Sequence, residues 1–170
     1  SGNAYCGDHD TAFSVVRYGN VIGSRGSVIP FFKSIKKGLP LPITDNRMTR
    51  FMISLEEGVE LVWKAFDDMI GGEIYVKKIP SMKVTDIALA VSSESKQEEV
   101  GIRPGEKLHE QMIGQEDALY TYQYPGFFKI LPSINDWDKD EKRIGTGVKV
   151  DLNFVYSSDT NSEWMSIETL

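Results

Sequence analysis

The sequence has 170 residues, 41% of them hydrophobic and 26% charged, which is the composition of an ordinary globular domain with room for a substantial core. Its net charge of -6 argues against general nucleic-acid binding, because that activity needs a basic face that releases counterions. A single cysteine, Cys6, leaves no partner for an internal disulfide and fits a reducing, cytoplasmic location. The two histidines, His9 and His109, are too far apart to indicate a metal site, and no apolar run has the length of a membrane span.

The first predicted elements are a loop over residues 1–11 and a strand over residues 12–18. The strand is apolar and rich in β-branched residues, which is typical of a buried strand in a parallel sheet. The turn that follows contains three glycines together with Asn20, Ser24 and Arg25. Backbone N–H groups in such a turn, at the carboxyl end of a strand, favour anions. We therefore expect the ligand-binding edge of an α/β sheet here.

A helix is predicted over residues 27–37, because apolar residues recur there at helical spacing and Gly38 supplies a stop. Residues 39–45, Leu-Pro-Leu-Pro-Ile-Thr-Asp, then indicate an extended segment, since the prolines disfavour helix on either side. Such a segment either packs in the core or borders a flat nucleobase. The residues by themselves favour packing.

Two arginines, Arg47 and Arg50, precede a second predicted helix. Ser54 and Glu57 have the spacing of a capping box, so the helix begins there, and two glycines at 71–72 end it. Arg50 is thus one short loop ahead of a rigid element. The residues expected to face the core share one side of this helix: Leu55, Val59, Val62, Phe66 and Met69.

The stretch over residues 100–113 is the second informative one. Its sequence predicts a strand end, an Arg-Pro-Gly turn and a helix that begins near Glu106, with Leu108 and two later residues, Met112 and Ile113, inward. Arg103 and Glu106 then lie at a strand-to-helix turn, on the same side of the sheet as the glycine-rich turn. His109, inside this helix, is expected to be structural.

The other segments give weaker patterns. A short strand is predicted over residues 73–76, and a helix capped by Thr85 precedes a polar surface connection over 92–99. An aromatic-rich segment over 118–124 is followed by a predicted strand from Phe127. Residues 133–150 are charged and irregular, and we expect Trp164 to fix the end of the chain to the body.

Four motifs occur in order: Arg-Tyr-Gly-Asn-Val-Ile-Gly at 17–23, Arg-Gly-Ser-Val-Ile-Pro-Phe-Phe at 25–32, Met-Thr-Arg-Phe at 48–51 and Gly-Ile-Arg-Pro-Gly-Glu-Lys-Leu-His-Glu at 101–110. Together they resemble the carboxyl-terminal half of an extended short-chain dehydrogenase/reductase (SDR) of the polysaccharide-biosynthesis branch. More narrowly, the chain is similar to the inverting UDP-N-acetylglucosamine 4,6-dehydratases. This resemblance implies an α/β fold: a partial Rossmann-type (extended SDR) fold, made of the substrate-binding part with one or two parallel strands and packed helices.

The resemblance implies three regions along the chain. Residues 1–11 are a loop left from a truncated Rossmann domain. Residues 12–132 contain the C-terminal Rossmann strand or strands and a nucleotide-sugar-binding domain. Residues 133–170 are an irregular C-terminal extension.

The resemblance also implies residues that contact the ligands. Tyr18 would lie beside the nicotinamide of the cofactor, and the Asn20 amide would bind a phosphate oxygen. Arg50 and Arg103 would clamp the pyrophosphate, since a guanidinium grips two oxygens at once. Glu106 would accept hydrogen bonds from the ribose hydroxyls.

The base and the sugar have implied contacts as well. Leu41 and Ile43, with the residue between them, would border the uracil, and Val28 would cap it from the helix start. Arg25, with Ser24, would face the sugar.

The sequence departs from this family at its beginning. It contains neither a glycine-rich dinucleotide fingerprint nor a Tyr-x-x-x-Lys pair, since Tyr5 is followed four residues later by His9. We therefore expect a substrate-binding fragment without catalytic residues, inactive by itself. NADP is the implied cofactor of an intact enzyme, and we expect this chain alone to bind none. The expected partners are a UDP-sugar and further copies of the chain, associated through a sheet edge that truncation exposes.

Two other functions stay open. A related UDP-sugar epimerase would bind the same UDP moiety, and the residues present discriminate poorly between the two reactions. A UDP-binding or assembly module without catalysis is the alternative outside the enzymes.

Overall fold

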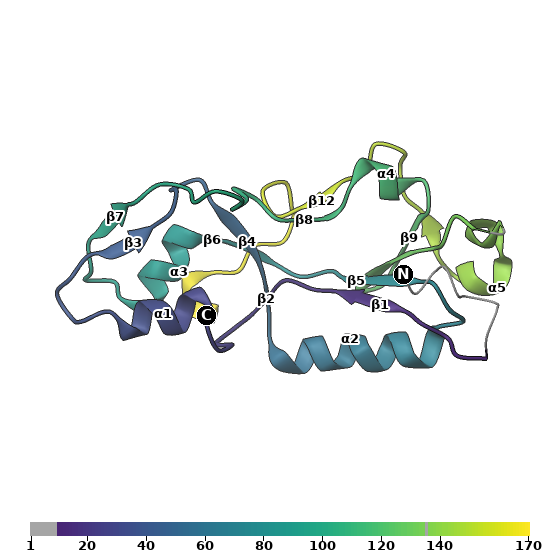
Figure 1. Cartoon of the computed structure of the whole chain (residues 1–170), viewed down its shortest axis with the longest axis horizontal. Coiled ribbons are helices and arrows are strands. Elements are labelled where there is room, and N and C mark those ends of the chain that lie inside the picture. The colour runs from purple at the N-terminus through teal and green to yellow at the C-terminus, as the bar shows by residue number, and fades with distance from the viewer. Residues whose placement is uncertain (1–9, 135) are drawn as a thin grey trace. The chain divides into compact units, whose positions relative to one another are not determined.

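The structure is a computed structural model that describes residues 10–134 and 136–170 (Figure 1). Most of the predicted loop over 1–11, with Cys6 and His9, therefore lies outside the described residues. The chain divides into two compact units, each built from separate stretches. The first contains the described residues up to Tyr18, Glu56–Lys78 and Met112–Tyr156, and the second contains Gly19–Leu55, Ile79–Gln111 and Ser157–Leu170.

The first unit is a mixed sheet covered by a helix. Its strands have the order β1-β5-β10-β9-β11, with β1 parallel to β5 and the other pairs antiparallel. Helix α2 (Leu55–Asp68) packs on this sheet (Figure 1). The strands are β1 (Val15–Arg17), β5 (Ile74–Lys77), β9 (Thr121–Tyr124), β10 (Phe127–Ile130) and β11 (Val148–Lys149). The short helices are α4 (Gln115–Ala118), η2 (Trp137–Lys139) and α5 (Glu141–Ile144).

The second unit contains two small sheets, two α-helices and a short 3-10 helix among its described residues. One sheet has the order β2-β4-β6, and the other is the parallel pair β3-β7. The strands are β2 (Asn20–Val21), β3 (Leu41–Ile43), β4 (Thr49–Ile53), β6 (Ser81–Lys83) and β7 (Gln97–Glu99). The helices are α1 (Val28–Ser34), α3 (Val84–Val91) and the short η3 (Ile167–Thr169). Two further strands, β8 (Gln111–Ile113) and β12 (Tyr156–Ser157), include residues at which the chain passes from one unit to the other.

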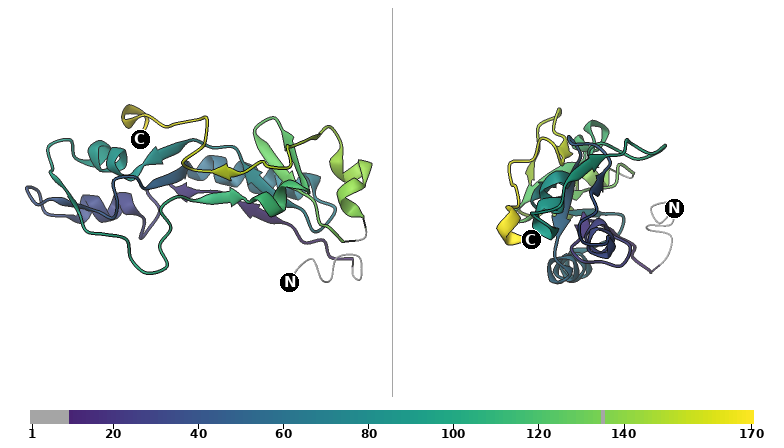
Figure 2. Two further views of the ribbon diagram at one scale, coloured as in Figure 1. Left: turned by 90° about the horizontal axis from the view of Figure 1, so that it is seen from above. Right: turned by 90° about the vertical axis from the view of Figure 1, so that its left-hand side faces the viewer.

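The core of the second unit joins its helices to its strands. Ile29 and Phe32 of α1 pack with Ile43 of β3 and with Ile87 of α3 in one buried cluster. The extended segment predicted over 39–45 is confirmed as β3, and the helix predicted over 27–37 is confirmed as the shorter α1. The C-terminal residues, yellow in Figures 1 and 2, run beside β6, where Ser81 forms a bridge with Trp164.

A buried hydroxyl network fixes the C-terminal segment to β4. The Oγ1 of Thr49 lies 2.7 Å from the Oγ of Ser158 and 2.8 Å from the Nδ1 of His109. The backbone N–H of Glu110 donates to the same serine oxygen at 2.9 Å. The hydrogen bond to Thr49 gives His109 a structural role, as the sequence predicts.

The strand predicted over 12–18 is present as the shorter β1, which pairs with β5 in parallel. It lies at an edge of the described sheet and leaves Val15 52% exposed, as expected of an edge that truncation exposes. Two predictions about elements are wrong. The buried side of α2 is Gly58, Leu61 and Ala65, whereas the predicted inward residues include several exposed ones: Leu55, Val59, Val62 and Phe66.

The second wrong prediction is the helix from Glu106. Residues 100–110 form turns without a helix, and residues Gln111–Ile113 are strand β8. Gly101 and Gly105 have φ values of 89° and 83°, a conformation that a helix does not contain. Arg103 and Glu106 are therefore presented by a turn.

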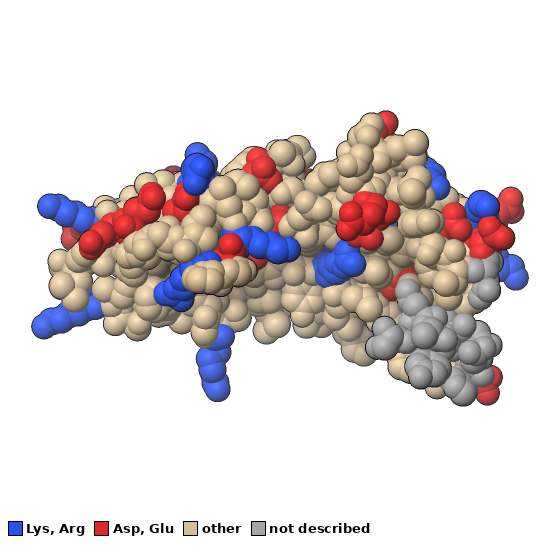
Figure 3. All heavy atoms as spheres, turned by 45° about the horizontal axis from the view of Figure 1, so that its top comes forward, with Lys and Arg blue, Asp and Glu red and all other residues tan. Residues whose placement is uncertain are grey.

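Within the described part of the chain, none of the helices combines the length and the apolar character needed to cross a membrane. On the face drawn in Figure 3, basic and acidic side chains are interspersed rather than gathered into a broad basic area. A face without a broad basic area agrees with the net charge of -6.

Candidate functional site

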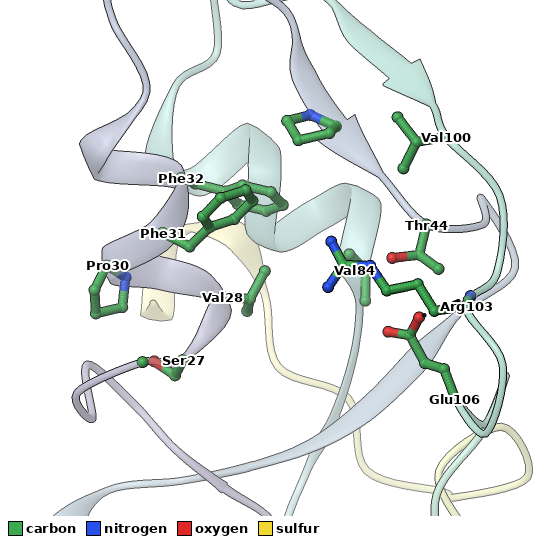
Figure 4. Close-up of a pocket in the computed structure, with 12 residues that line it drawn as sticks. Ser27, Val28, Pro30, Phe31, Phe32, Thr44, Val84, Val100, Arg103 and Glu106 are labelled. Atoms are coloured by element: carbon green, nitrogen blue, oxygen red, sulfur yellow. Dashed lines mark hydrogen bonds between the residues drawn. The ribbon is translucent and has the colours of Figure 1, made fainter.

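The second unit contains a cavity of about 600 Å³ between α1 and the turn that carries Arg103 (Figure 4). Side chains from five segments line it, so the core of this unit sets its shape. The lining residues are Gly26, Ser27, Val28, Pro30, Phe31, Phe32, Pro42, Thr44, Val84, Val100, Arg103 and Glu106. A largely apolar cavity of this size with a few charged groups is the usual form of a small-molecule site.

The wall formed by α1 is apolar except at its beginning. Phe31 and Phe32 lie with ring centroids 5.9 Å apart, and Val28 projects toward the cavity one turn earlier (Figure 4). The Oγ of Ser27 is buried, and the described residues provide it with no hydrogen-bond partner. An unpaired buried hydroxyl costs about 1–3 kcal/mol, and a polar ligand atom would relieve this cost.

The opposite wall carries the charges. The backbone N–H of Glu106 donates to the carbonyl of Arg103 at 3.0 Å, and the N–H of Arg103 donates to the Oε2 of Glu106 at 3.3 Å. These two bonds fix the turn, from which the Arg103 side chain extends into the cavity (Figure 4). A cation and an anion are thus presented side by side on one wall.

Arg50 lies behind this wall. It comes from β4, and its guanidinium donates to the carbonyls of Thr49 and Leu108 at 2.7 and 3.2 Å. Its Nη2 lies 3.9 Å from the Oε1 of Glu106, and its Nε lies 3.6 Å from the Oε1 of Glu110. Glu106 therefore contacts both predicted arginines, but Arg50 does not line the cavity, and its side chain is only 13% exposed.

Asn20 faces the same acidic cluster. The hydrogen-bond network orients its amide nitrogen toward both carboxylate oxygens of Glu110, each 3.1 Å away. Burial raises the pKa of Glu110, while the N–H of Phe51, at 3.3 Å, and the charge of Arg50 favour the ionised form. In this arrangement the Asn20 amide is occupied by protein, so binding a phosphate would require it to exchange partners.

Glu110 is a site-adjacent residue that the sequence interpretation missed. It contacts Asn20 and Arg50, two predicted phosphate ligands that come from the paired strands β2 and β4. The signal was present, because Glu110 follows Glu106 by four residues in the quoted motif. The prediction for this stretch was a helix with Leu108, Met112 and Ile113 facing the core, and it gave Glu110 no role.

Of the stretch 41–43 predicted to border the base, Pro42 alone lines the cavity. Leu41 and Ile43 are 3% and 0% exposed and belong to the core, whereas Pro42 and Thr44 line the cavity. Side chains alternate along a strand, so the two predicted residues share the inward face. The backbone of β3 is also engaged, because Leu41 donates to Lys96 and Ile43 accepts from Val100.

Two further predicted residues lie away from the cavity lining. Arg25 is exposed in the turn between Gly23 and Gly26, two glycines with positive φ. Tyr18 is the last residue of the first unit and is 43% exposed. Val28, Arg103 and Glu106 are the predicted site residues that the cavity brings together.

The sequence of the chain matches the family described as polysaccharide biosynthesis protein over residues 1–132. The chain belongs to this family. It is 51% identical over 175 residues to a UDP-N-acetylglucosamine 4,6-dehydratase (inverting) of Campylobacter jejuni, covering 99% of this chain and 52% of the relative. It is 40% identical over 168 residues to a UDP-glucose 4-epimerase of Rickettsia akari, covering 96% of this chain and 49% of the relative.

A solved structure also resembles this chain in sequence and in fold. The X-ray structure of Pen from Bacillus thuringiensis matches with a TM-score of 0.76 and 32% identity, covering 95% of this chain and 48% of that one. The predicted α/β class with parallel strands and packed helices is therefore confirmed. The chain spans about half the length of the polysaccharide biosynthesis relatives that it matches.

Proposed function

We propose that the chain binds the UDP moiety of a nucleotide sugar in the cavity of the second unit. In this proposal it is the nucleotide-sugar-binding part of a UDP-N-acetylglucosamine 4,6-dehydratase that works in the cytoplasm. The observation that carries the proposal is the juxtaposition of Arg103 and Glu106 on one wall with the apolar wall of α1 opposite. A nucleotide needs all three features: a flat apolar surface, a cation and a hydrogen-bond acceptor.

Each wall has a proposed ligand group. The base lies against Val28 and the phenyl rings of α1, bordered on the other side by Pro42 and Thr44. Arg103 binds the pyrophosphate, and its planar guanidinium matches two phosphate oxygens. Glu106 accepts hydrogen bonds from the ribose hydroxyls and also restrains Arg50 through their 3.9 Å contact. In this arrangement Arg50 contributes positive charge from behind the wall.

We propose that this chain alone binds no NADP. Tyr18 is the single predicted cofactor contact, and the sequence contains no Tyr-x-x-x-Lys pair. We therefore assign no oxidation, reduction or proton-transfer step to residues of this chain.

The test is a thermal-shift and calorimetry series with UDP. UDP should raise the melting temperature of the wild type, and Arg103→Ala should weaken UDP binding by about 1.5–3 kcal/mol, because a charge-assisted contact is lost. Lys33→Ala is the matched control, since it removes an exposed cation of α1 that does not line the cavity. In the same calorimeter NADP+ should give no heat of binding. Equal stabilisation of wild type and Arg103→Ala by UDP would refute the proposal.

An epimerase is the second candidate, and the similarity to the Rickettsia akari epimerase favours it. The two substrates differ at the sugar, so the wild-type melting temperature should discriminate between them. A larger shift with UDP-N-acetylglucosamine than with UDP-glucose at equal concentration supports the dehydratase. The reverse order supports the epimerase.

A further inference from the structure

The carboxylate of Glu110 is the point at which donors from two strands meet. The backbone N–H of Phe51 in β4 donates to its Oε2 at 3.3 Å, and the Nε of Arg50, also in β4, lies 3.6 Å from its Oε1. The amide nitrogen of Asn20 in β2 is 3.1 Å from both oxygens. Glu110 therefore holds the side chains of Asn20 and Arg50 together.

The charges around this carboxylate are balanced within the protein. The guanidinium of Arg50 is shared by two carboxylates, because it lies 3.9 Å from Glu106 and 3.6 Å from Glu110. Arg103 supplies a second positive charge beside Glu106, so these two arginines and two glutamates carry no net charge. Among the described residues, Lys107 also attracts Glu110, but it is exposed and solvent screens it.

A bound diphosphate disturbs this balance in two ways. Held by Arg103, it brings two negative charges to the cluster. The phosphate contact expected of Asn20 also draws the amide away from Glu110. A half-buried carboxylate that loses a donor and gains a neighbouring anion favours its neutral form. Burial already raises the pKa of Glu110, and its side chain is 32% exposed, so solvent can supply a proton.

We propose that Glu110 takes up one proton from solvent when the diphosphate of a nucleotide sugar binds in the cavity. This inference rests on the proposed function. Neutral Glu110 no longer competes for Arg50, whose charge then acts on the diphosphate, and the Asn20 amide is released to bind phosphate. Glu110 is thus a positioning residue, which acts through Asn20 and Arg50 without touching the ligand. Because binding and protonation are linked, the ligand binds more tightly as the pH falls.

The probe for the test is UDP-N-acetylglucosamine. Both of its phosphates are diesters, so neither titrates near neutral pH, whereas the terminal phosphate of UDP does. Calorimetry of the full chain in two buffers with different ionisation enthalpies measures the proton uptake. The wild type should take up a fraction of a proton, and it should bind roughly threefold or more tightly at about pH 6 than at about pH 8.

Glu110→Gln keeps the shape of the side chain and imitates the protonated acid. At about pH 8 this variant should bind as tightly as the wild type does at about pH 6, without proton uptake. A merely structural role for Glu110 would instead weaken binding at both pH values. The matched control is Glu98→Gln, an exposed glutamate of β7 that does not line the cavity, and it should keep the wild-type pH dependence.

A second measurement needs no substitution: NMR of the Glu110 carboxyl carbon in the wild type should show protonation when UDP-N-acetylglucosamine is added. Binding without proton uptake would overturn this inference and leave the proposed function standing. Uptake that persists in Glu110→Gln would also overturn it, because the proton would then belong to another group, such as His109. A wild type that does not bind the probe would overturn the proposed function and this inference together.

Discussion

A buried ion pair in the first unit shows how much a single residue contributes to this fold. Arg143 and Glu73 form a salt bridge with side chains 5% and 1% exposed. Arg143 also donates to the carbonyl of Gly71 and stacks its guanidinium 4.1 Å from the centroid of the Trp137 ring. The pair thus fixes the loop between α2 and β5 to α5.

Arg143→Leu should lower the free energy of unfolding by about 3–5 kcal/mol, because Glu73 would stay buried without its counter-ion. Lys139→Ala is the control: its pair with Asp136 is exposed on both sides, and solvent screens such pairs so that they contribute little to stability. Urea unfolding of the two variants measures the difference. Similar losses for both would contradict the assignment of a buried pair.

The carboxylate of Asp45, next to the cavity residue Thr44, gives a pH-dependent signal. Side-chain hydrogen bonds from Arg47, at 2.7 and 3.0 Å, lower the pKa of Asp45 from 3.8 to about 2. Since the folded pKa is below the ordinary one, the pairing stabilises the fold above pH 3.8 and is lost as the pH falls toward 2. Asp45→Asn should therefore flatten the stability curve in this window. Parallel curves for wild type and variant, measured by thermal unfolding, would rule out the effect.

At the scale of elements, two glycines in different elements have opposite requirements. Gly58 is inside α2, and a Cβ at this position meets nothing within 4 Å. Gly19 precedes β2, where its Cβ would collide with the backbone of Phe51 in the paired strand β4.

Gly58→Ala should raise the free energy of unfolding by about 0.5–1 kcal/mol, because alanine loses less backbone entropy in a helix. Gly19→Ala should lower it, because β2 and β4 must move apart. Chemical unfolding of the two variants checks both signs. A destabilised Gly58→Ala would mean that α2 is packed more closely there than the structure shows.

Most elements of this chain could be predicted from local sequence patterns. The glycine stop after α1, the prolines around β3 and the capping-box spacing before α2 are such signals, and the corresponding elements are found. The side of α2 that faces the core could not be predicted, because apolar residues cover more than half of its circumference and the pattern contains two possible inner faces. Residues 100–110 imitate a helical pattern, but Gly101 and Gly105 adopt positive φ.

The candidate site was predicted in part. Arg103 and Glu106 were identified from the motif that contains them, and Val28 from the start of α1. Pro42 lies within the predicted stretch 41–43, but its neighbours Leu41 and Ile43 face the core and Thr44 was missed, because the register of β3 depends on its pairing with β7, a strand far away in the sequence. Glu110 was missed for a similar reason: its partners Asn20 and Arg50 come from β2 and β4.

At the scale of the whole molecule, the stretches that build the two units alternate along the sequence. Each unit takes three separate stretches of the sequence, and the second unit includes Ser157–Leu170. Contacts between such distant stretches slow folding, because long loops must close before the contacts form.

This interleaving has a consequence for synthesis on the ribosome. The hydroxyl of Ser158 and the backbone near Trp164 complete hydrogen bonds with Thr49 and Ser81, residues translated much earlier. A nascent chain therefore cannot finish its second unit while residues beyond 157 are still inside the exit tunnel. Until then its half-built sheets are exposed to chaperones and proteases, and a premature stop codon in this last stretch would remove the final support of the cavity.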